Sequence, residues 1–252
     1  MSIILSAKDL CKTYIINKFN NNILKNINFE MEQGEFVSIM GPSGSGKSTL
    51  LYTISGMDSI TSGTVCFEGK SLSSFKAKEM SRLRLLKMGF IFQQMYMMKK
   101  LCIFDNIVLP GYQSGKPRKE INQRAEALMR RLGVIEIAEH SINEVSGGEL
   151  QRVCLCRALI NNPPIIFADE PTGALNSRAA NDVMRELTKV NVNGTSVLMV
   201  THSVKVAARS DRVLYLVDGQ ILGEISFGRL ENENELGKRE LTLSKWLVEQ
   251  NW

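Results

Sequence analysis

The sequence predicts an α/β fold in which helices cover a mainly parallel β-sheet. Short apolar runs alternate with helical segments in the second half of the chain, a pattern typical of parallel strands joined by helices. A glycine-rich loop also connects an early apolar strand to a helix. The 252 residues suffice for one large domain or two small ones, and 44% apolar with 23% charged residues is ordinary for a globular protein.

The N-terminal part of the chain is predicted to be rich in strands. β-prone runs lie on both sides of the turn-rich stretch NKFNNN at residues 17–22. A further strand contains a turn signal at Glu68-Gly69. The elements expected here are strand 2–16, strand 22–32, strand 34–40, helix 47–56, strand 63–72, helix 76–87 and strand 88–93.

The remainder is predicted to begin with helices and then to alternate helix and strand. The helices between Phe104 and Gly133 are expected to break at PGYQSGKP, residues 110–117. A stripe of apolar residues at helical spacing precedes Gly133, which should end that helix. The later elements expected are a helix from Gly147, strand 164–169, helix 177–190, strand 195–202, a short helix and strand 212–221.

Composition excludes several classes of protein. The formal net charge of +5 is small and does not indicate a nucleic-acid partner. No apolar run approaches the roughly 18 residues of a membrane span, and the N-terminus has no basic region typical of a signal peptide. The chain is therefore expected in the cytosol. The odd number of cysteines, without a CxxC, indicates reduced thiols rather than disulfides or a metal site.

The clearest motif is GPSGSGKST, which matches the phosphate-binding pattern G-x-x-x-x-G-K-[ST]. It follows a predicted strand and opens a predicted helix, as that motif requires. Lys47 should reach the β- and γ-phosphates, and the Ser48 hydroxyl should bind Mg²⁺. The residues expected to bind nucleotide are Gly41, Pro42, Ser43, Gly44, Ser45, Gly46, Lys47, Ser48 and Thr49.

A pair of carboxylates ends a later buried strand. In PIIFADEP, Asp169 follows the apolar run and suits a role in holding Mg²⁺, and Glu170 suits a base that orients and deprotonates water. The alternative is a solvated strand end, which the phosphate loop upstream disfavours. The chain is thus predicted to bind and hydrolyse a nucleoside triphosphate with Mg²⁺. No guanine-reading Asn-Lys-x-Asp motif is present, which disfavours GTP.

The stretch VSGGELQR predicts a helix start and a second site for an anion. Ser146 and Glu149 have the spacing of a capping box. That box does not explain Gly147 and Gly148, each of which costs about 1 kcal/mol relative to alanine within a helix. Glycines beside bare helix N–H groups are suited to close approach by an anion.

Five motifs in this order, GPSGSGKST, FQQ, VSGGELQR, IIFADEPTGALNS and MVTHS, resemble those of the ATP-binding cassette (ABC) family. The resemblance covers about residues 3–225. It implies a P-loop NTPase fold with an antiparallel β-subdomain and an inserted helical subdomain. Residues 1–252 are then expected to form one nucleotide-binding domain, with the helical subdomain near 95–160 and a C-terminal extension at 227–252.

The resemblance also implies roles for single residues. Tyr14 in CKTY corresponds to the aromatic residue that stacks on adenine, although a plain strand tyrosine is the alternative. Gln93 corresponds to the glutamine that contacts Mg²⁺ and the attacking water, and His202 to the histidine that contacts the γ-phosphate. Asn176 stands where most members carry aspartate, so the coupling role of that side chain is open.

In the ABC family the serine-glycine signature contacts ATP held by a second subunit. Ser146, Gly147, Gly148 and Glu149 are therefore expected to close over the ATP of a partner in a head-to-tail dimer with two ATP molecules. A carboxylate near phosphate would repel it, so Glu149 is expected to point back at its helix cap.

The motif details are most similar to the branch of macrolide exporters, lipoprotein-release complexes and bacitracin-type peptide-resistance transporters, and favour the last group. The implied protein is an ATPase at the cytoplasmic face of the membrane, with ATP and Mg²⁺ as cofactors and an integral membrane permease as partner. The stretch 94–110 would face that permease, with ordinary packing as the alternative. The tail face of Leu243, Trp246, Leu247 and Gln250 is expected to dock on the domain itself rather than on a membrane or partner.

The sequence gives less support to two other functions. A soluble ABC protein acting on ribosomes or DNA is disfavoured by the single cassette without a coiled-coil or zinc insert. A nucleotide switch that does not hydrolyse is disfavoured because Glu170 and His202 are both present.

Overall fold

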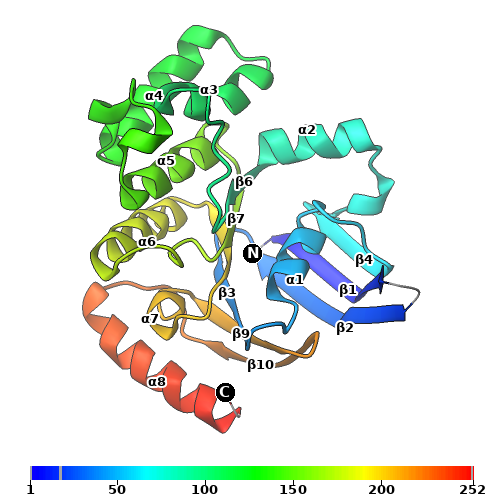
Figure 1. Ribbon diagram of the computed structural model, residues 1–252. Helices are drawn as coiled ribbons and strands as arrows, with labels where there is room; N and C mark the ends of the chain where they lie inside the picture. The colour runs from blue at the N-terminus through cyan, green and yellow to red at the C-terminus, as the bar shows by residue number, and fades with distance from the viewer. Residues whose placement is uncertain (1, 17–18, 251) are drawn as a thin grey trace. The chain divides into compact units, whose positions relative to one another are not determined.

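The computed structural model describes residues 2–16, 19–250 and 252 (Figure 1). The chain divides into two compact units, one formed by Met1–Met80 with Ser196–Trp252 and the other by Ser81–Thr195. Helix α2 (Ala77–Lys87) includes the first boundary. Short 3-10 helices are η1 (Leu72–Ser74), η2 (Ile135–Ile137), η3 (Ile142–Glu144) and η4 (Glu233–Glu235).

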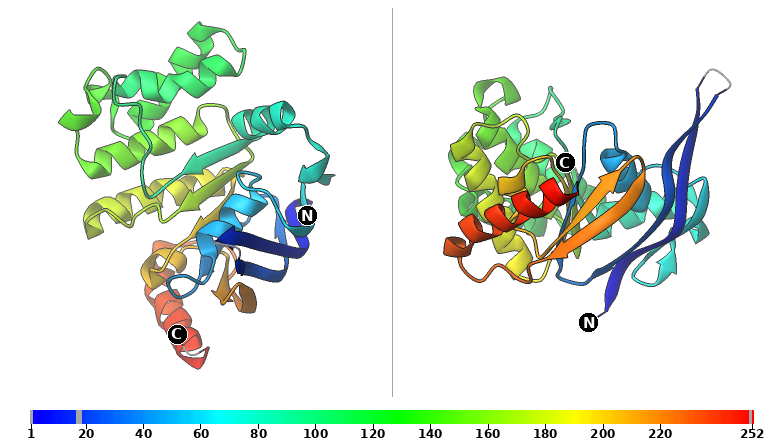
Figure 2. Two further views of the ribbon diagram at one scale, coloured as in Figure 1. Left: turned by 45° about the vertical axis from the view of Figure 1, so that its right-hand side comes forward. Right: turned by 90° about the horizontal axis from the view of Figure 1, so that it is seen from below.

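An antiparallel sheet in the first unit has the order β2-β1-β4-β5, and Figure 2 shows its two long blue strands, β1 and β2, side by side. Its strands are β1 (Ile3–Ile16), β2 (Phe19–Glu32), β4 (Ser62–Phe67) and β5 (Lys70–Ser71). Strand β2 begins earlier than the predicted residue 22, because Asn20 and Asn21 pair with β1 instead of forming a turn. The ladder of hydrogen bonds overrides the weak strand propensity of asparagine. Residues 17 and 18 of the predicted turn lie outside the described part.

The first unit also contains the parallel strands that the sequence predicts. Strand β3 (Phe36–Met40) lies between β8 (Ser196–Val200) and β9 (Arg212–Val217) and is parallel to both. Every residue of β3 and β8 is buried, as expected for strands covered on both faces. Helices of this unit are α1 (Lys47–Ile54), α7 (Val204–Ala207) and α8 (Leu236–Glu249).

The prediction of one strand over 212–221 is wrong. Strand β9 ends at Val217 and an antiparallel strand, β10 (Gln220–Ser226), begins after two residues. Asp218 and Gly219 have φ angles of 46° and 79°. Positive φ at both central residues is the requirement of the tight hairpin turn that matches strand twist.

Helix α8 docks on the first unit, as predicted for the tail (Figure 1). Leu243 and Leu247 are buried in a cluster that includes Met40 and Tyr215. The ring of Trp246 packs edge-on against Tyr215, with 6.2 Å between ring centroids. The apolar face of the tail is therefore used by the domain itself.

Shortening Leu243 to alanine should destabilise the first unit by about 2–5 kcal/mol, because its buried methyl groups would leave a cavity. Leu243 is 0% exposed. Val248→Ala in the same helix is the matched control, since Val248 is 71% exposed and should change stability by less than about 0.5 kcal/mol. Urea denaturation would measure both; equal midpoints for the two variants would contradict the docking of α8.

In the second unit, β6 (Met88–Ile91) pairs in parallel with β7 (Ile165–Asp169). Its further helices are α3 (Ile103–Gln113), α4 (Arg118–Arg131), α5 (Gly147–Leu159) and α6 (Ser177–Val192). The stripe predicted in α4 is confirmed, because Ala125, Leu128 and Met129 are buried. The assignment of 95–160 as a separate helical subdomain stays a prediction.

The predicted break at residues 110–117 is partly wrong, because α3 continues through Pro110 to Gln113. Proline there removes one helix hydrogen bond, but the surrounding contacts hold the turn. Asn161 donates its side-chain N–H to the Pro110 carbonyl at 3.2 Å. A Cβ atom at Gly111 would lie 2.5 Å from a methyl of Ile121, so glycine lets α3 pack closely on α4.

None of the helices in the described ranges is both long and apolar enough to cross a membrane.

Candidate active site

The glycine-rich loop lies between β3 and α1, as the sequence predicts. A Cβ atom at Gly41 would lie 2.0 Å from the Leu216 carbonyl oxygen, so only glycine fits there. Gly46 has a φ of 99° and precedes α1 without a side-chain cap. A helix that begins after a glycine turn, with no side-chain cap at that turn, is the arrangement of helix N-termini that bind phosphate.

Two side chains of this loop fit a phosphate. The Lys47 ammonium lies against the loop, donating to the carbonyl oxygens of Gly41 and Pro42 at 2.9 and 2.8 Å. The Ser45 hydroxyl is buried and has no hydrogen-bond partner among the described residues. A buried polar group of that kind costs free energy unless something satisfies it. The donors present therefore suit the phosphate groups of a nucleotide.

His202 is exposed and follows β8, which is parallel to β3. Because parallel strands point the same way, the residue after β8 and the loop after β3 lie at the same edge of the sheet. The sheet in this way puts His202 on the phosphate-loop side of the first unit.

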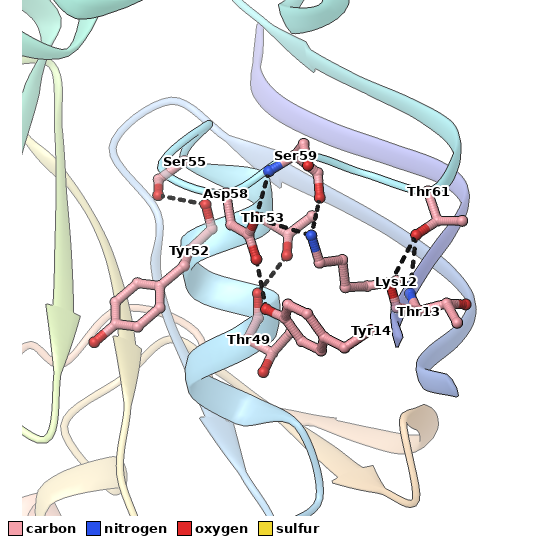
Figure 3. Close-up of polar contacts among 10 residues, drawn as sticks. All are labelled: Lys12, Thr13, Tyr14, Thr49, Tyr52, Thr53, Ser55, Asp58, Ser59 and Thr61. Carbon is pink, nitrogen blue, oxygen red and sulfur yellow. Dashed lines mark hydrogen bonds and ion pairs between the residues drawn. The ribbon is translucent and has the colours of Figure 1, made fainter. Parts of the chain in front are cut away.

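Tyr14 lies in a set of polar contacts at β1 and the end of α1 (Figure 3). Its hydroxyl donates to Asp58 at 2.5 Å. Burial and this bond to Asp58 raise the pKa of Tyr14 to about 12. The tyrosine is therefore neutral at physiological pH, and the residue is 36% exposed. The role of Tyr14 in stacking on adenine stays a prediction.

The second unit holds the candidate metal ligand and base. Asp169 is the last residue of β7 and is buried, with 6% of it exposed. Glu170 follows with a φ of 46°, a conformation that costs a non-glycine residue energy and is frequent at active sites. The Glu170 carbonyl accepts a hydrogen bond from the Gly173 amide at 3.1 Å, which closes a turn.

Gln93 lies at the same turn. A Cβ atom at Gly173 would be 3.2 Å from the Gln93 amide nitrogen and 3.6 Å from the Glu170 Cβ. The fold in this way brings Gln93 and Glu170 together across a glycine. Ser48, Gln93 and Asp169 carry the oxygen ligands that Mg²⁺ prefers, so these residue types fit the ion; their assignment stays a prediction.

The signature stretch forms the capping box that the sequence predicts. The Glu149 carboxylate accepts hydrogen bonds from the Ser146 amide at 2.8 Å and its hydroxyl at 2.6 Å. The Ser146 oxygen accepts from the Glu149 amide at 3.3 Å. Hydrogen bonds from the Ser146 side chain and backbone lower the pKa of Glu149. The carboxylate is thus turned back to the cap, as expected.

The two signature glycines have different surroundings. A Cβ atom at Gly148 would lie 2.9 Å from the Cβ of Ala179, so glycine is needed for α5 to approach α6. At Gly147 the nearest atom, in Leu175, would be 3.7 Å away, which is ordinary contact. Packing within the chain therefore explains Gly148, for which the sequence predicts contact with a ligand, but does not explain Gly147.

A cavity of about 260 Å³ opens beside these glycines. Asn176 caps α6 at its rim, where its side-chain oxygen accepts from the Ala179 amide at 2.9 Å. This is a bond that aspartate would make equally well. The cavity is lined by Ser146, Gly147, Gly148, Arg152, Ala174, Leu175, Asn176, Arg178, Ala179 and Asp182. Two of the lining residues are arginines to which the sequence motifs assign no role: Arg152, the last residue of VSGGELQR, and Arg178, which directly follows IIFADEPTGALNS.

A phosphate loop with its lysine after a buried strand, and a strand-end aspartate followed by glutamate, define the class of P-loop nucleoside triphosphatases. A family model described as ABC transporter matches residues 24–173. The chain belongs to this family. It is an ATPase, the ATP-hydrolysing subunit of a membrane transporter whose partners are a membrane permease and a second cassette.

Named relatives lie in the expected branch. The chain is 44% identical to the lipoprotein-releasing system ATP-binding protein LolD of Aquifex aeolicus, covering 90% of this chain and 99% of the relative. It is 40% identical to the ABC transporter ATP-binding protein YknY of Bacillus subtilis, over 86% and 95%. Identity is also 40% to the bacitracin export ATP-binding protein BceA of Halalkalibacterium halodurans, over 89% of each chain.

Solved structures share the fold. The dimeric structure of the bacterial cassette MJ0796 has a TM-score of 0.83 and 38% identity, covering 88% of this chain and 98% of that one. A post-hydrolysis dimer of MJ0796 bound to ADP and phosphate matches equally well. CbiO1 of Clostridium perfringens, with a TM-score of 0.80 and 23% identity over 90% and 89% of the chains, shows the fold alone.

Proposed function

We propose that this chain drives a membrane transporter for antimicrobial peptides by closing and opening an ATP-bound dimer. The peptide assignment is supported by the likeness to a bacitracin export ATPase. Lipoprotein release is the second candidate, supported by the 44% identity to LolD. The chain would work at the cytoplasmic face of the membrane.

The mechanism assigns each site residue a task. The phosphate loop and Lys47 hold the β- and γ-phosphates while Tyr14 stacks on adenine. Ser48, Gln93 and Asp169 would hold Mg²⁺, whose charge neutralises that developing on the phosphates. Glu170 takes the proton of the attacking water, and His202 contacts the γ-phosphate. The turned-back Glu149, with its two bonds to Ser146, leaves the N–H groups at Gly147 to the partner's ATP.

A surface after Gln93 is suited to the permease. Tyr96 and Met98 are 64% and 54% exposed. Arg157 holds their segment by donating to the carbonyl oxygens of Met95 at 2.7 Å and Tyr96 at 2.9 Å. The backbone is therefore held in place while the side chains of Tyr96 and Met98 are exposed, and the flexible methionine suits contact with a partner.

The dimer is tested by placing a negative charge at Gly147. The Gly147→Asp variant should bind ATP within about twofold of the unchanged chain, but should not dimerise with ATP, because the carboxylate repels the partner's phosphate. The fold tolerates the change, since a Cβ there meets nothing closer than 3.7 Å. Light scattering with ATP measures the dimer.

The control is Gly237→Asp, which places the same charge in the first turn of α8, where a Cβ meets nothing within 4 Å. This control should dimerise normally. Normal ATP-driven dimerisation of Gly147→Asp would refute the contact across the dimer.

The substrate is tested on the complex purified with its permease in vesicles. Stimulation of ATPase activity by bacitracin, and none by a lipidated peptide, supports peptide transport. The reverse result would assign the chain to lipoprotein release.

A further inference from the structure

An ion pair to which the sequence motifs assign no role, between Lys12 and Asp58, lies directly beside Tyr14. Lys12 is only 5% exposed, and its ammonium donates to Asp58 at 2.8 Å and to the Ser59 carbonyl at 2.6 Å. The other oxygen of Asp58 accepts the Tyr14 hydroxyl (Figure 3). One carboxylate therefore joins a buried cation to the aromatic residue expected to meet the nucleotide base.

The hydrogen bonds from Lys12 and Tyr14 stabilise the charged form of Asp58. Burial alone would raise the pKa of Asp58, but hydrogen bonds from Lys12 and Tyr14 outweigh it and lower that pKa. Asp58 is therefore a carboxylate at neutral pH and accepts from both neighbours. Charge-assisted bonds of this kind are about twice as strong as neutral ones.

The arrangement selects one face of the Tyr14 ring. Lys12 and Tyr14 are two residues apart in β1 and so point to the same side of the strand. The Lys12 nitrogen lies 4.6 Å from the centre of the tyrosine ring, in the position of a cation–π contact. A flat base can therefore stack only on the opposite face.

The cluster also connects the ring to the phosphate-binding helix. Asp58 follows α1, and its amide donates to the Tyr52 carbonyl in that helix at 3.1 Å. The Tyr14 hydroxyl is thus connected, through Asp58, to the end of the helix whose N-terminus carries the phosphate loop.

We propose that Lys12 and Asp58 are positioning residues for nucleotide binding, which hold the Tyr14 ring at a fixed place and angle relative to the phosphate loop. The proposal rests on the proposed stacking of Tyr14 on adenine. The ion pair does not touch the nucleotide. It holds the tyrosine ring in place before binding, which lowers the conformational entropy that is lost when the nucleotide binds.

The test compares binding of ATP with binding of inorganic triphosphate by calorimetry on the full chain. A base stacked on an aromatic ring adds to the affinity for the nucleotide. Asp58→Ala should therefore weaken ATP binding about 5- to 20-fold, while triphosphate binding changes less than about twofold. Tyr14→Phe keeps the ring but loses its anchor, and should weaken ATP binding by a smaller factor with the same selectivity for ATP.

A second variant separates positioning from folding. Asp58→Ala leaves the Lys12 charge buried without its partner, which is destabilising. The double variant Lys12→Met with Asp58→Leu removes both charges and should fold, yet show the same selective loss of ATP binding. Thr61→Val is the matched control, because Thr61 bonds the backbone of Thr13 and not Tyr14; it should bind both ligands normally.

The proposal is overturned if the double variant binds ATP within twofold of the unchanged chain, or if ATP and triphosphate binding weaken equally. Tyr14→Ala distinguishes this failure from a failure of the proposed function. If Tyr14→Ala loses ATP selectivity but the double variant does not, the positioning role alone is wrong. If Tyr14→Ala binds ATP normally, the stacking role of Tyr14 is wrong and the positioning role falls with it.

Discussion

Replacing Glu170 by glutamine should slow ATP hydrolysis by about 10²- to 10⁴-fold, the usual contribution of a general base. ATP binding should be preserved, because the amide keeps the shape of the side chain but cannot take the proton of the attacking water. The variant should therefore accumulate as an ATP-bound dimer. Glu170 directly follows the buried Asp169, and its turn lies beside Gln93, which is where a water-activating group is needed.

Phosphate release over many turnovers measures this effect, and light scattering measures the trapped dimer. Glu126→Gln makes the same chemical change on the exposed side of α4 and should hydrolyse ATP at the normal rate. A Glu170→Gln variant with normal turnover would show that another group accepts the proton.

Replacing Lys47 by alanine should weaken ATP binding by about 10²-fold or more, because a hydrogen-bonded charge on the phosphates is removed. Triphosphate binding should fall equally, since Lys47 acts on the phosphates and not on the base. The ammonium already lies against the loop carbonyls of Gly41 and Pro42. Removing the ammonium takes away the hydrogen-bond donor of these two carbonyl oxygens and also that of the phosphate.

Calorimetry with both ligands measures the loss. Lys238→Ala removes a lysine from the exposed first part of α8 and should leave both affinities unchanged. Undiminished ATP affinity of Lys47→Ala would refute the phosphate-binding role of the loop.

Much of the fold could be predicted because its signals are local. The spacing within GPSGSGKST determines the loop and the start of α1, and the capping box determines where α5 begins. The β9–β10 hairpin is not predicted, although Asp218-Gly219 is a strong turn signal, because the apolar run before this turn favours one continuous strand. The break assigned at Pro110 ignored contacts from Asn161 and Ile121 that only the folded chain supplies.

The parts of the site that could not be predicted depend on residues distant in sequence. Lys12 and Asp58 are 46 positions apart, so no spacing rule joins them. The packing of Gly148 on Ala179 likewise depends on how α5 meets α6. Local patterns therefore identified the groups that would touch nucleotide, and missed the groups that support them.

The different surroundings of the two signature glycines affect how related sequences should be interpreted. Gly148 is required for the close packing of α5 on α6. Selection for a stable fold would therefore retain this glycine even in a descendant that no longer used ATP. At Gly147, by contrast, packing within the chain leaves room for a side chain. A relative that keeps the second glycine but replaces the first with a bulky or acidic residue is thus a candidate for a folded cassette that has lost its half of the shared site.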